Sequence, residues 1–253
     1  MEAVLLTGEL TLHGRVMPAS NATFVGEIAA RRVVYKPVAG ERPLWDFPDG
    51  TLAEREEAAY LVSEALGWDL VPLTFRRDGP YGPGMVQLWQ EPDPVQEAVT
   101  LVAEDVVPDG FLHVFDGLDD RDHVVSLVHE DTPELRRMAV FDAVVNNADR
   151  KGGHVLAMPG GHRYGVDHGL TFHVEHKLRT VLWGWAGELL GEDDRVCLER
   201  LADQLDDELG ERLVGLLTPA EVEATRRRVK RLLRVGTLPE PGQGWRAIPW
   251  PPF

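Results

Sequence analysis

Short apolar runs separated by turn residues dominate the first ninety positions and predict β-strands. Residues 3–12, 23–28 and 33–36 are mostly apolar, and the third run ends at Pro37 because proline cannot continue a sheet ladder. Residues 71–75 and 85–89 predict two further strands, joined by a turn over residues 78–84. The period-two alternation of a strand places Lys36 on the same face as Val34.

One helix is predicted among these strands, over residues 51–66. Thr51 is a suitable N-cap with Glu54 three residues later, and Gly67 supplies the stop. Apolar residues recur at helical spacing at Ala58, Leu61, Val62, Ala65 and Leu66. This face is expected to pack against the strands.

The pattern changes at Glu91-Pro92-Asp93-Pro94, after which the apolar period becomes helical. Residues 131–147, 179–190, 193–209 and 219–233 each predict a helix. We therefore expect an α+β protein of two lobes. Residues 1–90 would form a small antiparallel-sheet lobe with one helix, and residues 91–253 a larger, mainly helical lobe. The two would make one unit around a cleft, which 253 residues suffice to build.

The net charge of −16 restricts the partners. Nucleic acids and anionic membranes bind basic surfaces, so we expect neither a nucleic-acid partner nor stable membrane association. Residues 226–231 form the one dense basic run, and an exposed helix face explains it better than a binding patch. The single cysteine, Cys197, excludes an intramolecular disulfide and a cysteine-based zinc cluster. Without a secretory signal pattern or an apolar run near the ~20 residues of a membrane span, a cytoplasmic location is expected.

Two acidic residues stand in polar, glycine-containing loops of the second half. Asp149 lies in the stretch from Asn147 to His154, directly after an apolar helix, and Asp167 precedes a His-Gly step. Phosphoryl transfer from a nucleotide needs such a pair, one carboxylate to orient the attacking hydroxyl and one to hold the metal. Asp149 is the candidate base, Asp167 the candidate magnesium ligand, and Arg150 could pair with Asp149 or with a substrate phosphate.

Lys36 is the candidate phosphate-binding lysine, held by a glutamate of the following helix. Glu54, Glu56 and Glu57 are all possible partners, because each position turns the helix by about 100°. The alternative for Lys36 alone is a side chain that reaches solvent from a strand end.

Two further segments are candidate nucleotide contacts. Ser20 and Asn21 could donate to phosphate oxygens from a loop, and Gln87-Leu88-Trp89 could offer backbone groups to adenine, although core strand residues fit the second pattern as well. His154 is a candidate metal ligand. With His168, His173 and His176 it also permits a transition-metal site, since imidazole suits such metals better than magnesium.

These motifs resemble the phosphatidylinositol 3-/4-kinase-like branch of the kinase superfamily, nearest the type II phosphatidylinositol 4-kinases and uncharacterised actinobacterial relatives. The resemblance rests on Lys36-Pro37, residues 55–60, residues 86–88, residues 147–150 and residues 166–169, in that order. It implies a bilobal protein-kinase-like fold, ATP with Mg²⁺ or Mn²⁺, phosphate binding by Lys36, and Glu56 as its partner. It also implies catalysis by Asp149 and metal binding by Asp167. His154 stands where most kinases carry a metal-binding asparagine. This difference favours a site with a single metal ion, a preference for manganese, or a protein that binds nucleotide without catalysing transfer.

The leading hypothesis is an ATP-dependent phosphotransferase, an atypical kinase acting on a protein or small-molecule hydroxyl. A nucleotide-binding pseudokinase that serves as a regulator is the alternative, and a metal-dependent hydrolase built on the histidines comes third. The acidic surface argues against a phosphoinositide substrate. Nucleotidyl transfer in place of phosphoryl transfer stays open.

Overall fold

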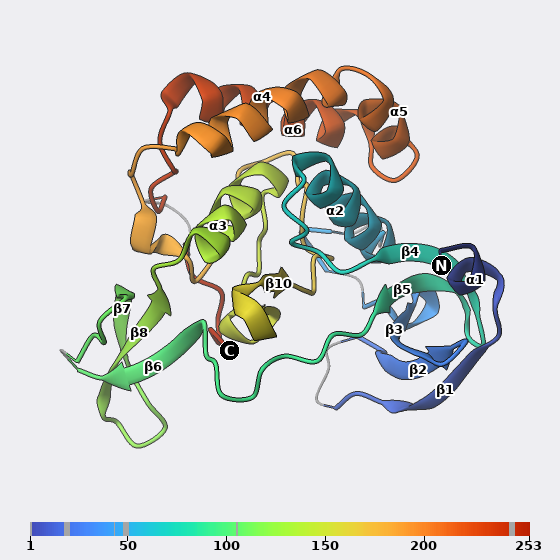
Figure 1. The fold of residues 1–253 in the computed structure, drawn as a ribbon, viewed down its shortest axis with the longest axis horizontal. Coiled ribbons are helices and arrows are strands. Elements are labelled where there is room, and N and C mark those ends of the chain that lie inside the picture. Colours follow the sequence, from blue (N-terminus) through green and yellow to red (C-terminus); the bar gives the residue numbers. More distant parts are fainter. Residues whose placement is uncertain (1, 18–20, 43, 48–50, 105, 243–245) are drawn as a thin grey trace.

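The N-terminal part is a five-stranded antiparallel sheet with one long helix beside it (Figure 1). The computed structural model describes residues 2–17, 21–42, 44–47, 51–104, 106–242 and 246–253. Strands β1 (Leu10–Arg15), β2 (Phe24–Ile28), β3 (Arg31–Pro37), β4 (Thr74–Gly79) and β5 (Gly82–Leu88) pair in the order β1-β2-β3-β5-β4. Helix α2 (Leu52–Leu66) connects β3 to β4, as the apolar spacing predicts.

Three details of this part differ from the expectation. Residues 3–12 are not one strand, because α1 (Glu2–Thr7) precedes β1 and ends where the Gly8 amide bonds the Val4 carbonyl oxygen. The expected strand over 71–75 begins at Thr74, and the hairpin turns more tightly than expected. Thr51 does not cap α2 with its side chain; the Glu41 carboxylate accepts the first helical amides instead.

The second part is less helical than its sequence pattern suggests. A three-stranded antiparallel sheet in the order β6-β8-β7 is formed by β6 (Val99–Ala103), β7 (Phe111–Leu118) and β8 (Val124–Glu130), and it was not predicted. Helix α3 (Pro133–Val145) follows as expected, then the hairpin of β9 (Val155–Ala157) and β10 (Arg163–Gly165). Three further helices are α4 (Glu192–Leu205), α5 (Glu208–Val214) and α6 (Pro219–Val235).

The prediction of a helix over residues 179–190 is wrong. This segment is irregular, with one 3₁₀ turn at Trp183–Trp185, and it hydrogen-bonds the loop that contains Asp149. The Arg150 amide donates to the Arg179 carbonyl, and the Val181 amide donates to the Arg150 carbonyl. Tertiary hydrogen bonds therefore override the local helical spacing. The helix expected over 193–209 also breaks, at Asp206 and Asp207, into α4 and α5.

The main hydrophobic core joins the two parts. Its buried side chains come from α2, α3, α4, α5 and α6, and Figure 1 shows the last three helices as a layer over α2 and α3. A separate core fills the N-terminal sheet, and a small cluster of Phe47, Leu52 and Ala148 lies between the parts. The protein is thus α+β, with an antiparallel-sheet N-terminal part and a mainly helical C-terminal part in a kinase-like bilobal arrangement. In the described part of the chain, no helix is long and apolar enough to cross a membrane.

Candidate functional site

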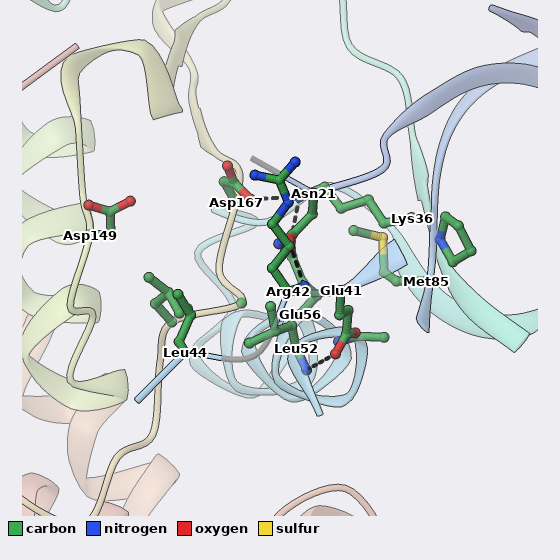
Figure 2. Close-up of a pocket in the computed structure, with 14 residues that line it drawn as sticks. Asn21, Lys36, Glu41, Arg42, Leu44, Leu52, Glu56, Met85, Asp149 and Asp167 are labelled. Atoms are coloured by element: carbon green, nitrogen blue, oxygen red, sulfur yellow. Dashed lines mark hydrogen bonds and ion pairs between the residues drawn. The ribbon is translucent and has the colours of Figure 1, made fainter. Parts of the chain in front are cut away.

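Side chains from both parts of the chain line one cleft of about 320 Å³. Lys36 comes from β3 and Glu56 from α2, whereas Asp149 and Asp167 come from two loops of the C-terminal part. We call these the Asp149 loop (residues 147–154) and the Asp167 loop (residues 166–172). Figure 2 shows Lys36 and Asp149 on opposite sides of the cleft, with Asp167 between them.

Lys36 is held by two carboxylates. Its Nζ lies 2.7 Å from Glu56 Oε1 and 2.6 Å from Asp167 Oδ1. Alternation along β3 buries Val33 and Tyr35 in the sheet core and turns Lys36 toward the cleft. Among the three candidate glutamates, Glu56 is therefore the one that meets Lys36; Glu54 and Glu57 bind Arg76 instead.

The opposite charges of Lys36 and Asp167 stabilise the ionised form of each residue. Burial alone would lower the pKa of Lys36, but the charges of Asp167 and Glu56 outweigh it and raise that pKa. The charge of Lys36 in turn holds the pKa of Asp167 far below its usual range, against the effect of burial. Both groups are consequently ionised at neutral pH. The Asp167 side chain remains 53% exposed, so it can accept a further ligand from the cleft.

Glu56 also positions the Asp167 loop. Its second oxygen, Oε2, accepts a hydrogen bond of 2.9 Å from the His168 amide. Asp167 itself adopts φ 63°, a left-handed conformation that non-glycine residues rarely take and that is common at functional sites. Helix α2 thus fixes both the lysine and the backbone beside the aspartate.

The Asp149 loop is anchored from below by Asp142 on α3. The Asp142 carboxylate accepts from Arg150 Nε and Nη2, the shortest of these bonds being 2.9 Å, and from Asn147 Nδ2 at 3.0 Å. Asn147 Oδ1 then accepts the Asp149 amide at 2.9 Å. This network holds the Asp149 backbone at the cleft.

Arg150 does not have the role expected for it. Its side chain is fully buried, and it pairs with Asp142 rather than with Asp149 or the open cleft. Arg150 Nη2 also donates to His168 Nε2 at 2.7 Å, which ties the Asp149 loop to the Asp167 loop. The guanidinium therefore aligns the two loops and has no access to a substrate phosphate.

Asp149 is the one carboxyl of the cleft with a strongly raised pKa. Burial raises it to about 6, although the charges of Lys151 and Arg179 oppose this effect and that of Asp167 adds to it. Its carboxylate accepts no hydrogen bond from the described residues. A carboxylate with a pKa near neutrality is well matched to proton transfer at physiological pH.

His154 lies between the two aspartates. Its Nδ1 is 2.9 Å from the Asp149 carbonyl oxygen, so this nitrogen carries a proton and donates it. Its Nε2 lies 3.4 Å from Asp167 Oδ2. Burial lowers the pKa of His154, with the charges of Arg150 and Lys36 adding to this and that of Asp167 opposing it. In the neutral ring the Nε2 lone pair therefore faces a carboxylate oxygen.

The histidines do not form one metal centre. His168 is buried and accepts from Arg150, and His173 packs edge-on against Phe47 at 5.4 Å. His176 lies elsewhere, beside α6. In the part of the chain that the structure describes, no three His, Cys, Asp or Glu side chains are grouped as a metal cluster.

Other candidate nucleotide contacts have mixed outcomes. Asn21 lines the cleft, and its Oδ1 accepts the Arg42 amide at 3.0 Å, whereas Ser20 lies outside the described residues. Gln87, Leu88 and Trp89 do not line this cleft. The Gln87 side chain is buried and donates to Thr74, and the Leu88 and Trp89 amides donate to the carbonyl oxygens of Leu73 and Arg32. Their proposed contact with adenine stays a prediction.

Two contributors were missed in the sequence. Arg42 lines the cleft, and its guanidinium forms no ion pair with the described residues. Asn146 ends α3 at φ 54°, and its amide group binds the His173 and Glu175 carbonyls and the Lys177 amide. The helix predicted over residues 131–147 runs past Asn146, but an asparagine near the end of an apolar helix is a recognisable signal for such a left-handed cap.

Comparison with known proteins places this geometry in context. No protein-family model matches the chain. It is 52% identical over 264 residues to Protein Rv2133c of Mycobacterium tuberculosis, covering 99% of this chain and 95% of that protein. The chain belongs to the family of Protein Rv2133c. Among solved structures it is similar to the Helicobacter pylori proinflammatory kinase CtkA, with a TM-score of 0.50 and 11% identity, over 92% of this chain and 94% of that one. This second likeness supports a kinase-like fold.

Proposed function

We propose that the protein is an ATP-dependent phosphotransferase that transfers a phosphoryl group to a protein or small-molecule hydroxyl. One observation carries the proposal: Lys36 lies between Glu56 and Asp167, at 2.7 and 2.6 Å, in a cleft that Asp149 also lines. A lysine fixed by a helix glutamate, a metal carboxylate and a base are the parts that phosphoryl transfer from a nucleotide requires. ATP supply would place this reaction in the cytoplasm.

The donors at Asp167 fit a divalent metal ion. Asp167 supplies carboxylate oxygens, which Mg²⁺ and Mn²⁺ both accept, and phosphate oxygens of the nucleotide would complete the ligand set. The Nε2 lone pair of His154 converges on the same region, with no proton between it and Asp167 Oδ2 in the neutral ring. This pair of acceptors suits a cation, and an imidazole favours Mn²⁺ over Mg²⁺. When bound, the metal would neutralise charge on the phosphates.

The residues of the chain would then act as follows. Lys36 would contact phosphate oxygens while Glu56 keeps its ammonium group in place. Asp149, across the cleft, would orient the acceptor hydroxyl and take up its proton as the oxygen attacks the γ-phosphorus of ATP. The bond from that phosphorus to the bridging oxygen would break, and ADP would leave with this oxygen. Asp142 and Arg150 would hold the backbone of both loops during the step. The −16 net charge of the chain favours a protein or small-molecule acceptor over a phosphoinositide.

One feature favours the second candidate, a nucleotide-binding regulator without transfer activity. Both oxygens of Asp167 already have a neighbour, Lys36 at 2.6 Å and His154 at 3.4 Å. The Lys36 ammonium group therefore already neutralises this carboxylate and would compete with a metal ion for it. A protein that binds ATP while Lys36 keeps Asp167 from the metal would not transfer phosphate.

Conversion of ATP to ADP, with Mn²⁺ and with Mg²⁺, tests the proposal. The native protein should turn over ATP, and Asp149→Asn and Asp167→Asn should each abolish the activity. Asp120→Asn, an exposed change between β7 and β8, is the matched control and should retain it. Metal-dependent ATP binding without turnover by the native protein would select the regulator instead. Turnover that survives both cleft substitutions would refute the assigned roles.

A further inference from the structure

A second concave surface lies between α6 and the segment that follows the Asp167 loop. It has a volume of about 550 Å³ and is lined by His176, Arg227, Arg228, Lys230, Arg231 and Arg234, together with small apolar side chains. We call it the basic groove. Five cationic side chains on one surface are unexpected in a chain of net charge −16, so the groove concentrates positive charge against the trend of the molecule.

The arginines of the groove repeat along one face of α6. Arg227, Arg231 and Arg234 are spaced i, i+4 and i+7, which makes them neighbours on the helix surface, where like charges destabilise a helix. The chain has 42 acidic residues, yet Arg231 and Arg234 form no ion pair with any residue that the structure describes. The helix dipole favours a cation in the last turn, but this effect does not reach Arg227. Arg227 has Glu223 at 3.7 Å and Lys230 has Asp206 at 3.2 Å, both at exposed positions. The charges of Arg231 and Arg234 are therefore the ones that no carboxylate of the described residues offsets.

Arg228 lies at the floor of the groove, and its guanidinium forms no ion pair with a carboxylate of the described residues. Arg228 donates to the carbonyl oxygens of Val144 and His173, at 3.2 and 2.5 Å. Burial, and then the charge of Arg227, lower its pKa to about 10. The pKa of His176 is lowered too, by burial and then by Arg231 and Arg228. These contacts and shifts agree on a positive potential that an anionic ligand would relieve.

Packed side chains connect the floor of the groove to the wall of the cleft. Arg228 binds the carbonyl of His173, whose ring packs against Phe47. Phe47 clusters with Leu52 and Leu170, and both of these line the cleft that contains Asp149. The segment between the Asp167 loop and His176 therefore links the two sites, and a polypeptide in the groove would have to follow this segment to bring a hydroxyl to the base.

We propose that the basic groove docks an acidic segment of a polypeptide acceptor whose hydroxyl is presented to Asp149. This inference rests on the proposed phosphotransferase function and names its substrate class. The distance from Arg227 to Arg234 along the helix is about 10 Å, which an extended peptide covers with about three residues. Carboxylates spaced about three residues apart would match the arginines. The net charge of −16 would oppose the long continuous charge of a nucleic acid more than that of a short acidic stretch, so the peptide fits better.

A fluorescein-labelled octaglutamate peptide is the probe, and fluorescence anisotropy measures its binding at 50 mM and 200 mM salt. The native protein should bind it, more weakly at the higher salt concentration. Arg227→Glu/Arg231→Glu should weaken binding about tenfold or more, because two attractions become repulsions. The matched control is Arg15→Glu/Arg31→Glu, which makes the same charge change at exposed positions of β1 and β3 and should leave binding unchanged. Thermal unfolding of both variants establishes that they are folded.

Three results would overturn the proposal: no binding of octaglutamate to the native protein, equal weakening by the two double variants, or equal binding of an octalysine peptide. If a single-stranded RNA oligonucleotide binds more tightly and displaces the peptide, the ligand of the groove is a nucleic acid and not a polypeptide. The assay needs neither ATP nor metal, so its failure is distinct from the failure of the phosphotransferase proposal. In a transfer assay on an acidic serine peptide, the groove variant should raise KM and leave kcat unchanged.

Discussion

Replacing Asp149 by asparagine should stabilise the fold at neutral pH even though it removes the proposed base. Burial raises the pKa of Asp149 from 3.8 to about 6, so its ionised form is less favourable in the folded protein than in the unfolded chain. The folded state binds this proton more tightly, and the charge therefore destabilises the fold increasingly as the pH rises from about 4 to about 6. Asparagine has a similar shape and no charge, and the Asp149 carboxylate accepts no hydrogen bond from described residues that asparagine would lose.

The size of the effect follows from the shift. A pKa change from 3.8 to about 6 corresponds to about 3 kcal/mol of unfolding free energy at pH 7, about half of that at pH 5, and almost nothing below pH 4. Asp149 is partly open to the cleft, and screening by water reduces the expected gain at pH 7 to about 1–3 kcal/mol. The pH dependence is thus more diagnostic than the magnitude.

Urea unfolding of the native protein, Asp149→Asn and Asp120→Asn at pH 4, 5, 6 and 7 measures this difference. The Asp149 variant should gain stability progressively over this range, while the control stays within about 0.5 kcal/mol of the native protein. A loss of stability in Asp149→Asn, or a gain that is the same at every pH, would refute the argument that a buried, ionised Asp149 is held at the cleft at a cost in stability.

The remaining predictions concern the metal, the C-terminal residues and the join between the two parts. His154→Asn replaces the imidazole by an amide oxygen, so ATP turnover should shift its preference from Mn²⁺ toward Mg²⁺; an unchanged activity ratio for the two metals would show that His154 is no ligand. Gly152→Ala would push a methyl group into the Phe253 ring, which packs on the Asp149 loop, and should make the C-terminus more sensitive to carboxypeptidase, with unchanged sensitivity contradicting that packing. Arg55→Met leaves Glu221 buried without its partner at 2.6 Å and should cost about 3 kcal/mol in urea unfolding; a loss under 0.5 kcal/mol would show that this pair does not fasten α2 to α6.

Local patterns in the sequence predict the elements that local forces specify. Period-two alternation gives β3 and turns Lys36 away from the sheet core, and helical spacing followed by glycine gives α2 with its end at Gly67. The same spacing argument fails for residues 179–190. Their backbone groups bond the Asp149 loop, and no pattern within the segment reveals a partner thirty residues earlier. The sheet of β6, β7 and β8 was not predicted, because β6 and β7 do not alternate regularly between apolar and polar residues and keep most of their side chains exposed or half-buried.

The candidate site shows the same division. The residue types and their order along the chain suggest which side chains meet, and the structure brings Lys36, Glu56 and Asp167 together. Partner choice among neighbouring charges needs the fold. Arg150 stands next to Asp149 in sequence but pairs with Asp142, because α3 turns that carboxylate under the loop. The Glu41 carboxylate that caps α2 lies eleven residues before the first residue of the helix, beyond the reach of a capping motif.

Calorimetric titration of ATP into the native protein and into Asp167→Asn, with Mn²⁺, with Mg²⁺ and without metal, measures whether Lys36 and Asp167 form a metal-assisted nucleotide site. ATP binding should strengthen at least tenfold with metal and lose this gain in Asp167→Asn, because the metal would lack its carboxylate. Binding that is indifferent to metal and to Asp167, or no binding under any of the three conditions, would contradict such a site.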